Sequence, residues 1–156
     1  MNEASHALKE PLEDVFRKCA FLDLEIRPSA GKFSAAWTLC TSVRCGNNSG
    51  VCVVLMATPE LATTIADNYL GIPEGSRVGQ RIDVISELAN VLAGQAFEIV
   101  RGGIRPESIS LPALLSSREA LDAWEQSGRG CKFTICTETE TVGGLLVVVK
   151  DEWSAL

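Results

Sequence analysis

The sequence predicts one α+β domain in which helices alternate with β-hairpins. Its 156 residues are enough to bury a core without disulfides or metals. A content of 46% hydrophobic and 22% charged residues is typical of a folded globular chain. Apolar residues recur at helical spacing over residues 81–100, whereas residues 51–56 (VCVVLM) form a nearly continuous apolar run typical of a buried strand. We therefore expect a single domain over residues 1–156.

The first half is predicted to contain a helix followed by strands. Residues 4–21 carry apolar side chains at helical spacing, and Pro11 predicts a kink or a late helix start because it lacks an N–H group. The elements expected next are a possible strand at 22–27, a turn at 28–31, and a hairpin of strands 36–44 and 51–56 around the GNNSG turn at 46–50.

The second half is predicted to begin with two helices. Thr58 is a good N-cap residue, Pro59 fits the first helical position, and Gly71 ends the helix after about Leu70. The elements expected after it are a loop at 72–80, a long helix at 81–100 closed by Gly102 and Gly103, an edge strand or bulge at 108–115, a helix or loop at 118–126, a turn at 127–130, and a hairpin of strands 132–137 and 144–150.

Charge and composition argue against two classes of partner. The net charge is −6 and basic residues cluster only in pairs, so neither nucleic acid nor an anionic membrane is expected as a partner. No apolar run approaches the roughly 20 residues that span a bilayer. The N-terminus, MNEASHALKE, lacks the basic start and apolar stretch of a signal peptide. We therefore expect a cytoplasmic protein.

The six cysteines lie mostly within apolar strand patterns, and the sequence contains no CxxC motif. We interpret them as small buried hydrophobes, with a metal or redox role as the alternative. The only histidine is His6, which disfavours Ser/His and Cys/His catalysis. An enzyme built on this chain would depend on carboxylates and amides, or on groups that a partner supplies.

The helix predicted at 81–100 has a polar face of unusual composition. Asp83, Glu87, Asn90 and Gly94 follow at offsets of four, three and four residues, so they form one row. Asn and Gly both lower helix stability, and such choices in a good helix suggest function. The alternative is an ordinary solvated face with a glycine kept for packing. The opposite side is a predicted core stripe of Ile82, Ile85, Leu88, Ala89, Leu92, Ala96 and Ile99.

The two halves of the chain resemble each other, which suggests a duplicated helix-plus-hairpin unit, with chance similarity as the alternative. In the helix alignment, Asp14 takes the place of Asn90, and Pro11 takes that of Glu87, so only the second copy carries the polar row. The matching segments are Leu12–Phe21 with Leu88–Phe97, Trp37–Thr41 with Phe133–Thr137, and Gly50–Leu55 with Gly144–Val149.

The spacing Asp83-x-x-x-Glu87-x-x-Asn90, with Pro112 downstream, resembles the signature of the CheC/CheX/FliY phosphatases of bacterial chemotaxis. Here 21 residues separate Asn90 from Pro112, one fewer than in the family pattern. The segment SELANVLAGQA at 86–96 is similar in particular to the single active helix of CheX, whereas CheC normally carries two such helices.

This resemblance implies a two-layer α+β (α/β) fold in which long helices pack on one face of a largely antiparallel sheet. It implies a pseudo-twofold duplication, with a degenerate half at about 4–57 and an active half at about 81–150. It also implies a homodimer that shares strands, and a substrate that is the phosphoaspartate of a CheY-type receiver. The protein would need no cofactor or metal of its own, because the receiver supplies Mg²⁺ and a lysine.

The resemblance also implies roles for the polar row. Asn90 would orient the attacking water without adding charge, and Glu87 would pair with the receiver's lysine. Asp83 would contact the receiver or be favoured by the helix dipole. The alternative is a non-catalytic module that binds a receiver or scaffold, like the flagellar switch proteins of the same superfamily. The small Gly94 and Ala93 would let the helix backbone sit close to the receiver, and Pro112 would shape the neighbouring edge. The candidates for partner contact are thus Asp83, Ala93, Gly94 and Pro112.

Overall fold

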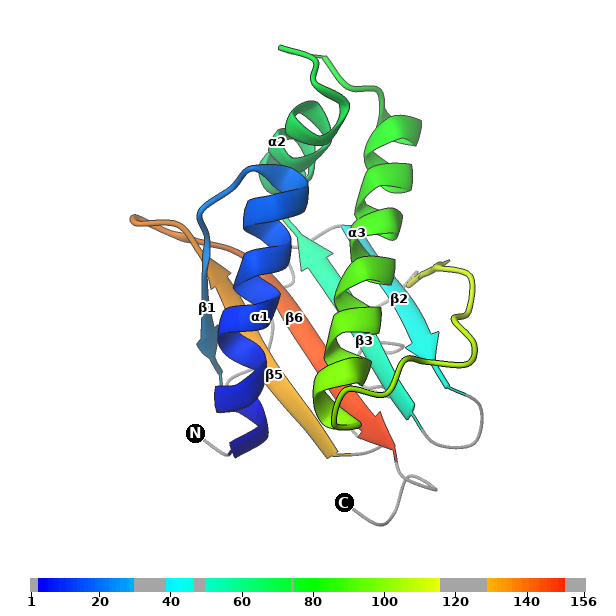
Figure 1. The fold of residues 1–156 in the computed structure, drawn as a ribbon. Helices are drawn as coiled ribbons and strands as arrows, with labels where there is room; N and C mark the ends of the chain where they lie inside the picture. The colour runs from blue at the N-terminus through cyan, green and yellow to red at the C-terminus, as the bar shows by residue number, and fades with distance from the viewer. Residues whose placement is uncertain (1–2, 30–38, 47–49, 74, 116–128, 151–156) are drawn as a thin grey trace.

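The computed structural model describes residues 3–29, 39–46, 50–73, 75–115 and 129–150. These residues form two layers, with three helices on one face of a six-stranded antiparallel sheet (Figure 1). The predicted α+β class, with helices on an antiparallel sheet, is confirmed. The elements are α1 (Glu3–Ala20), β1 (Glu25–Pro28), β2 (Leu39–Cys45), β3 (Gly50–Ala57), α2 (Pro59–Leu70), α3 (Val78–Val100), β4 (Ala113–Leu114), β5 (Arg129–Cys136) and β6 (Thr141–Lys150).

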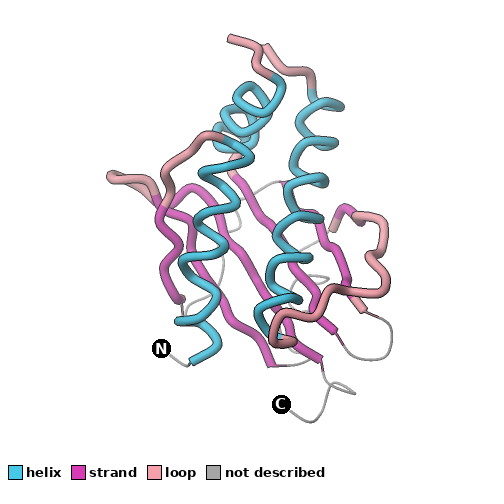
Figure 2. Tube along the Cα trace, in the orientation of Figure 1, coloured by secondary structure: helices cyan, strands magenta, loops and turns pink. Residues whose placement is uncertain are grey.

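The sheet has the strand order β1-β5-β6-β3-β2-β4, which is symmetric about its centre. The hairpins β2–β3 and β5–β6 meet through β3 and β6, and each outer strand pairs with the hairpin of the other half. The helices lie in front of this sheet in Figure 2, with α1 over the β5–β6 side and α3 over the β2–β3 side. This arrangement has the approximate twofold symmetry that the internal repeat predicts.

The central strands are apolar on both faces because both faces are buried. On the helix side, Val51, Val53 and Leu55 of β3 belong to the main core beneath the helices. The β3 residues that alternate with them point to the opposite face and belong to a second buried cluster, together with two residues of β6. This cluster consists of Cys52, Val54, Met56, Leu146 and Val148. Burial on two faces explains why this strand reads as a continuous apolar run instead of an alternating one.

The capping predictions for α2 are confirmed. The Thr58 hydroxyl accepts a hydrogen bond from the Leu61 N–H at 3.2 Å, and Pro59 occupies the first turn. Gly71 ends the helix in the left-handed region, with φ of 68°. Local sequence signals therefore determine both ends of this helix.

The other two helices begin earlier than predicted. The Gln80 side chain accepts a hydrogen bond from the Arg77 N–H at 2.8 Å, which caps α3 and allows a start at Val78. The late start considered for α1 is wrong, because the helix already contains residues before Pro11. Leu8 and Leu12 on either side of that proline are fully buried, and their packing offsets the lost hydrogen bond.

Two predicted strands are shorter or displaced in the structure. The first covers Glu25–Pro28 instead of 22–27, and the edge strand predicted at 108–115 is reduced to Ala113–Leu114. The turns at 28–31, 46–50 and 127–130, the start of the strand at 36–44, and the segment 118–126 lie wholly or partly outside the described residues. Within the described residues, no helix combines the length and apolarity needed to cross a bilayer.

Candidate functional site on helix α3

Helix α3 lies beside α1 on the helix-covered face of the sheet. It packs on β2 and β3 and contacts α1 and α2. A groove of about 340 Å³ between α1 and α3 is lined by Val91 and Gln95, which identifies the flank of α3 that faces α1. At about 100° per residue, Asn90 lies about 100° from Val91 and about 140° from Gln95. Asn90 therefore lies on the flank of α3 away from α1, and Figure 1 shows β2 on that side of the helix.

The predicted core stripe of α3 is correct but too narrow. Ile85, Leu88, Ala89, Leu92 and Ala96 are buried, whereas Ile82 and Ile99 are half-buried. Val84, Ala93 and Phe97 are buried as well, because α3 packs against two helices in addition to the sheet. The helix keeps only a limited outer face for solvent or a partner.

The polar row occupies this outer face. Asp83 and Glu87 are exposed, and Asn90 and Gly94 are half-buried. Within the described residues, no hydrogen bond or ion pair engages the carboxylate of Asp83 or Glu87. The two negative charges on this helix face thus have no described ion-pair partner, which leaves both carboxylates available to a cationic group of another protein.

Asn90 is the least satisfied member of the row. Its Oδ1 atom is buried and has no hydrogen-bond partner among the described residues. A buried acceptor without a partner costs about 1–3 kcal/mol, so such an atom is rare without a reason. No described hydrogen bond to Oδ1 therefore holds the carboxamide in its present orientation, and its oxygen and NH₂ group can accept and donate, respectively, once a partner is bound.

Gly94 and Ala93 differ sharply, although both were predicted to let a partner approach the helix. A Cβ atom added at Gly94 would meet nothing within 4 Å, so packing does not require this glycine and the packing alternative fails. Ala93 is fully buried. Its methyl group therefore belongs to the core, and the prediction that its small size lets a partner approach the helix stays a prediction.

Pro112 lies in a bulge at the edge of the sheet. Ser42 pairs with Ala113, and Cys45 forms a bridge with Ile109. The distance along the chain is three residues from Ser42 to Cys45 but four from Ile109 to Ala113. The extra residue falls between Ile109 and Ala113, where a proline costs no ladder hydrogen bond. The prediction that Pro112 shapes an edge or bulge is confirmed.

The first copy of the row lacks the same chemistry. Pro11 replaces the glutamate, and Asp14 forms an ion pair with Arg17, whose guanidinium also lies 3.6 Å from Asp23. Since its carboxylate already has a cationic partner, Asp14 offers less to an incoming protein than Glu87 does.

Among the cysteines whose side chains the structure describes, none gives a sign of a reactive site. Cys45, Cys52, Cys131 and Cys136 are buried, in agreement with their interpretation as small hydrophobes. Burial raises the pKa of the Cys45 thiol to about 11, so it remains protonated at neutral pH. The described residues contain no group of three or more side chains that could hold a metal ion.

Two features near α3 escaped the sequence analysis. Thr41 of β2 is fully buried, and its Oγ1 atom has no hydrogen-bond partner among the described residues. The segment 104–114 carries four exposed apolar residues, Ile104, Ile109, Leu111 and Leu114. The signal for the second feature was present as large hydrophobes in a Pro- and Ser-containing loop, but exposure cannot be read from that composition.

The fold is that of the CheC-like and CheX class of chemotaxis proteins, as the resemblance of the polar row implied. A CheX from Vibrio vulnificus matches with a TM-score of 0.68 at 16% identity, over 94% of this chain and 99% of that chain. A chain of the CheX-CheY-BeF₃-Mg²⁺ complex from Borrelia burgdorferi matches with a TM-score of 0.71 at 11% identity, over 96% and 99% of the two chains.

A chain of a complex that contains FliM shares the fold as well. A chain of the FliM-SpeE complex from H. pylori matches with a TM-score of 0.61 at 13% identity, over 94% of this chain and 84% of that chain. No family model and no curated protein sequence matches this chain. Because all these identities are low, the comparisons define the fold, and function rests on the site itself.

Proposed function

We propose that this protein is a phosphatase that hydrolyses the phosphoaspartate of a CheY-type receiver in bacterial two-component signalling. The observation that carries the proposal is the outer face of α3, where the unpaired Glu87 carboxylate lies one turn before Asn90 with its unpartnered Oδ1. The spacing of these residues resembles the signature of the CheC/CheX/FliY phosphatases. The residues of this signature thus lie on a fold that resembles CheX, so sequence and structure support the same proposal.

The chemistry requires little from the phosphatase. A phosphoaspartate is a mixed anhydride, and water attacks its phosphorus while the P–O bond to the aspartate breaks. The products are inorganic phosphate and a free carboxylate, with a proton of the water released. Since phosphoryl transfer depends mainly on positioning and charge stabilisation, a carboxamide that holds the water in line supplies the missing contribution. Asn90 can do so without placing a further negative charge beside the phosphoryl group.

The other members of the site hold the receiver in register. Glu87 pairs with the receiver's active-site lysine, and Gly94 lets the receiver approach the helix backbone. Asp83 provides a second contact near the start of α3, and Pro112 shapes the neighbouring edge. Mg²⁺ comes with the receiver, so the protein needs no metal of its own.

The proposal includes a homodimer as the working form, as the resemblance implies, and a cytoplasmic location, as the sequence predicts. One of the structural matches is a chain of the CheX-CheY complex from Borrelia burgdorferi. That pairing supports a receiver as the partner of this fold.

The test is the decay rate of a phosphorylated CheY-type receiver with and without this protein. We expect the parent protein to accelerate decay and Asn90→Ala to lose about 100-fold in rate while it still binds the receiver. Gln95→Ala is the matched control, because Gln95 is also a half-buried amide but lies on the α1 flank of the same helix. Equal activity of Asn90→Ala and the parent protein would refute the assigned role.

A non-catalytic docking module is the second candidate, because a FliM complex supplies one of the structural matches. This candidate predicts binding to a receiver or scaffold without acceleration of dephosphorylation. It also predicts that Asn90→Ala changes affinity alone. The same decay experiment, combined with a binding measurement, distinguishes the two candidates.

A further inference from the structure

We propose that the segment Ile104–Leu114, called here the edge segment, is a second part of the receiver-docking surface and supplies its apolar anchor. This inference rests on the proposed function and extends it from the polar row to a neighbouring element. Four large apolar side chains of the edge segment are exposed: Ile104 at 65%, Ile109 at 50%, Leu111 at 89% and Leu114 at 53%. Four exposed large apolar side chains within one short segment are more than singly scattered surface hydrophobes, and they favour an interaction site.

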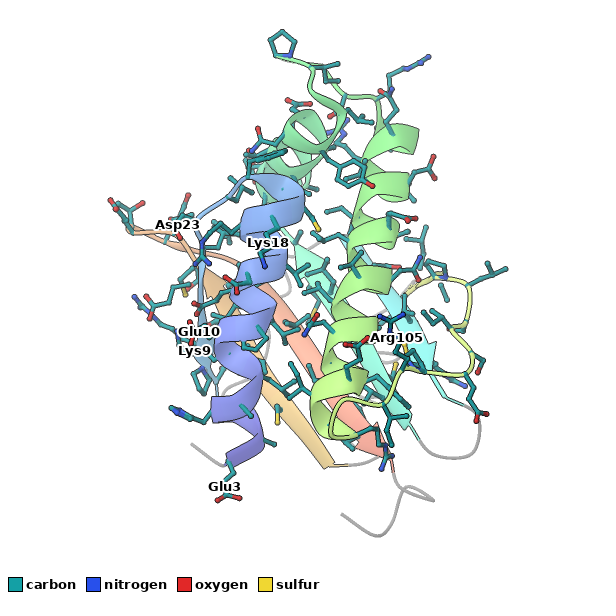
Figure 3. All side chains as sticks on the ribbon, in the orientation of Figure 1. Glu3, Lys9, Glu10, Lys18, Asp23 and Arg105 are labelled. Atoms are coloured by element: carbon teal, nitrogen blue, oxygen red, sulfur yellow. The ribbon has the colours of Figure 1, made fainter. Side chains whose placement is uncertain are left out.

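The edge segment lies on the flank of α3 that carries Asn90. It leaves the C-terminal end of α3 and pairs with β2, the strand on the side of α3 away from α1. Figure 3 shows Arg105 beside the C-terminal half of α3, and the Arg105 Nε atom lies 4.0 Å from Glu98 Oε1. The backbone of the edge segment therefore runs along the flank of α3 that carries Asn90.

The strand register places Leu114 on the helix side of the sheet. Leu114 stands directly opposite Thr41, and opposing residues of paired strands share one face. Thr41 alternates with Val43 and Cys45, which belong to the core beneath the helices. Leu114 thus lies at the corner between the sheet edge and α3, on the flank of Asn90.

The receiver is favoured over a second copy of this chain as the occupant. Strand β4 has only two residues and is preceded by the bulge at Pro112. A short, bulged edge disfavours the addition of another strand, which is how a second copy would use this edge. Docking through side chains is not hindered in this way.

The size of a specific interface also requires more than the polar row. A stable protein–protein interface buries roughly 1,200–2,000 Å² in total and contains an apolar centre within a polar rim. The row consists of two carboxylates, an amide and a glycine, which supply charge and close approach but little apolar area. The edge segment provides that area immediately beside the row.

The test measures binding of a CheY-type receiver carrying Mg²⁺ and BeF₃, together with the oligomeric state. We expect Leu111→Asp and Leu114→Asp each to weaken receiver binding about tenfold or more, and the conservative Leu111→Met to restore binding. Phe21→Asp is the matched control: Phe21 is 73% exposed at the end of α1, and its left-handed backbone, with φ of 53°, tolerates aspartate. This control should bind within about twofold of the parent protein.

The outcomes separate this inference from the proposed function. If the parent protein accelerates receiver decay and both leucine variants bind normally, the edge segment is not part of the docking surface and only this inference fails. If Leu111→Asp dissociates a dimer without changing receiver affinity, a second copy is the occupant and the inference is overturned. If the parent protein neither binds nor dephosphorylates a receiver, both proposals fail.

Discussion

Val53 of β3 stands directly opposite Val147 of β6, and the two residues occupy the same position in the two sequence repeats. An approximate twofold axis therefore passes between them, at the centre of the sheet. The two halves related by this axis nevertheless differ in their helices. Helix α3 carries Glu87 and Asn90, where α1 has Pro11 and Asp14.

This asymmetry predicts that Asp14→Ala leaves phosphatase activity within about twofold of the parent value. The Asp14 carboxylate is already paired with Arg17, and loss of an exposed pair of this kind costs no more than about 0.5 kcal/mol in stability. Receiver decay rates and urea unfolding check both statements. A loss of activity as large as that of Asn90→Ala would mean that the first copy also has a working site.

The exposed carboxylate of Glu87 predicts a binding defect in Glu87→Gln. This substitution keeps the side-chain size and removes the charge, so we expect receiver affinity to fall about tenfold and to depend less on salt. Titration calorimetry at two salt concentrations measures both effects. Glu60→Gln, at an exposed position in the first turn of α2, serves as the control and should bind as the parent protein does.

The open space around Gly94 predicts that one substitution there raises stability and that a larger one weakens receiver binding. Gly94→Ala should stabilise the protein by about 0.5–1 kcal/mol, because alanine favours the helix and its methyl group meets no neighbour within 4 Å. Gly94→Leu should also fold but bind the receiver at least tenfold more weakly, because the larger side chain blocks close approach.

Gly79 provides the control for this pair, since a Cβ atom there likewise meets nothing within 4 Å. Gly79→Leu places the same bulk in the first turn of α3 and should leave receiver binding nearly unchanged. Thermal unfolding and receiver titration are the two measurements. Normal binding by Gly94→Leu would show that the receiver does not approach α3 at this position.

The burial of Ala93 predicts a stability defect instead of a docking defect. Ala93→Leu inserts three carbon atoms into a packed core, and we expect a loss of about 1–3 kcal/mol. Urea unfolding measures this loss as a lower midpoint. At temperatures where the variant remains folded, its receiver affinity should match that of the parent protein, and a selective loss of affinity would contradict the assignment.

The raised pKa of Cys45 predicts a loss of stability at alkaline pH. Burial moves this pKa from 9.0 to about 11 in the folded state, so the unfolded state ionises first as the pH rises. The contribution of Cys45 is therefore complete below pH 9 and is lost between about pH 9 and pH 11. Unfolding free energies of the reduced protein at pH 8 and pH 10 test this, and Cys45→Ala should show a smaller decrease.

Much of the secondary structure was predictable because its signals are local. Thr58 and Gly71 define the ends of α2 through groups within a few residues of them. The order of Asp83, Glu87, Asn90 and Gly94 along one helix face follows from helical geometry alone. The apolar run at residues 51–56 likewise predicted a buried strand, although not that one face lies beneath the helices and the other in a separate cluster.

The sequence alone determined which residues share a face of α3, because 3.6 residues per turn determine that angle in any environment. Only the tertiary structure decided which of them are accessible. Ala93 is buried and Gly94 is open although they are adjacent, because α3 packs against β2, β3 and two helices. The position of Leu114 at the edge of the sheet likewise depends on the pairing of β4 with β2, a contact between residues more than 70 positions apart, which local periodicity cannot encode.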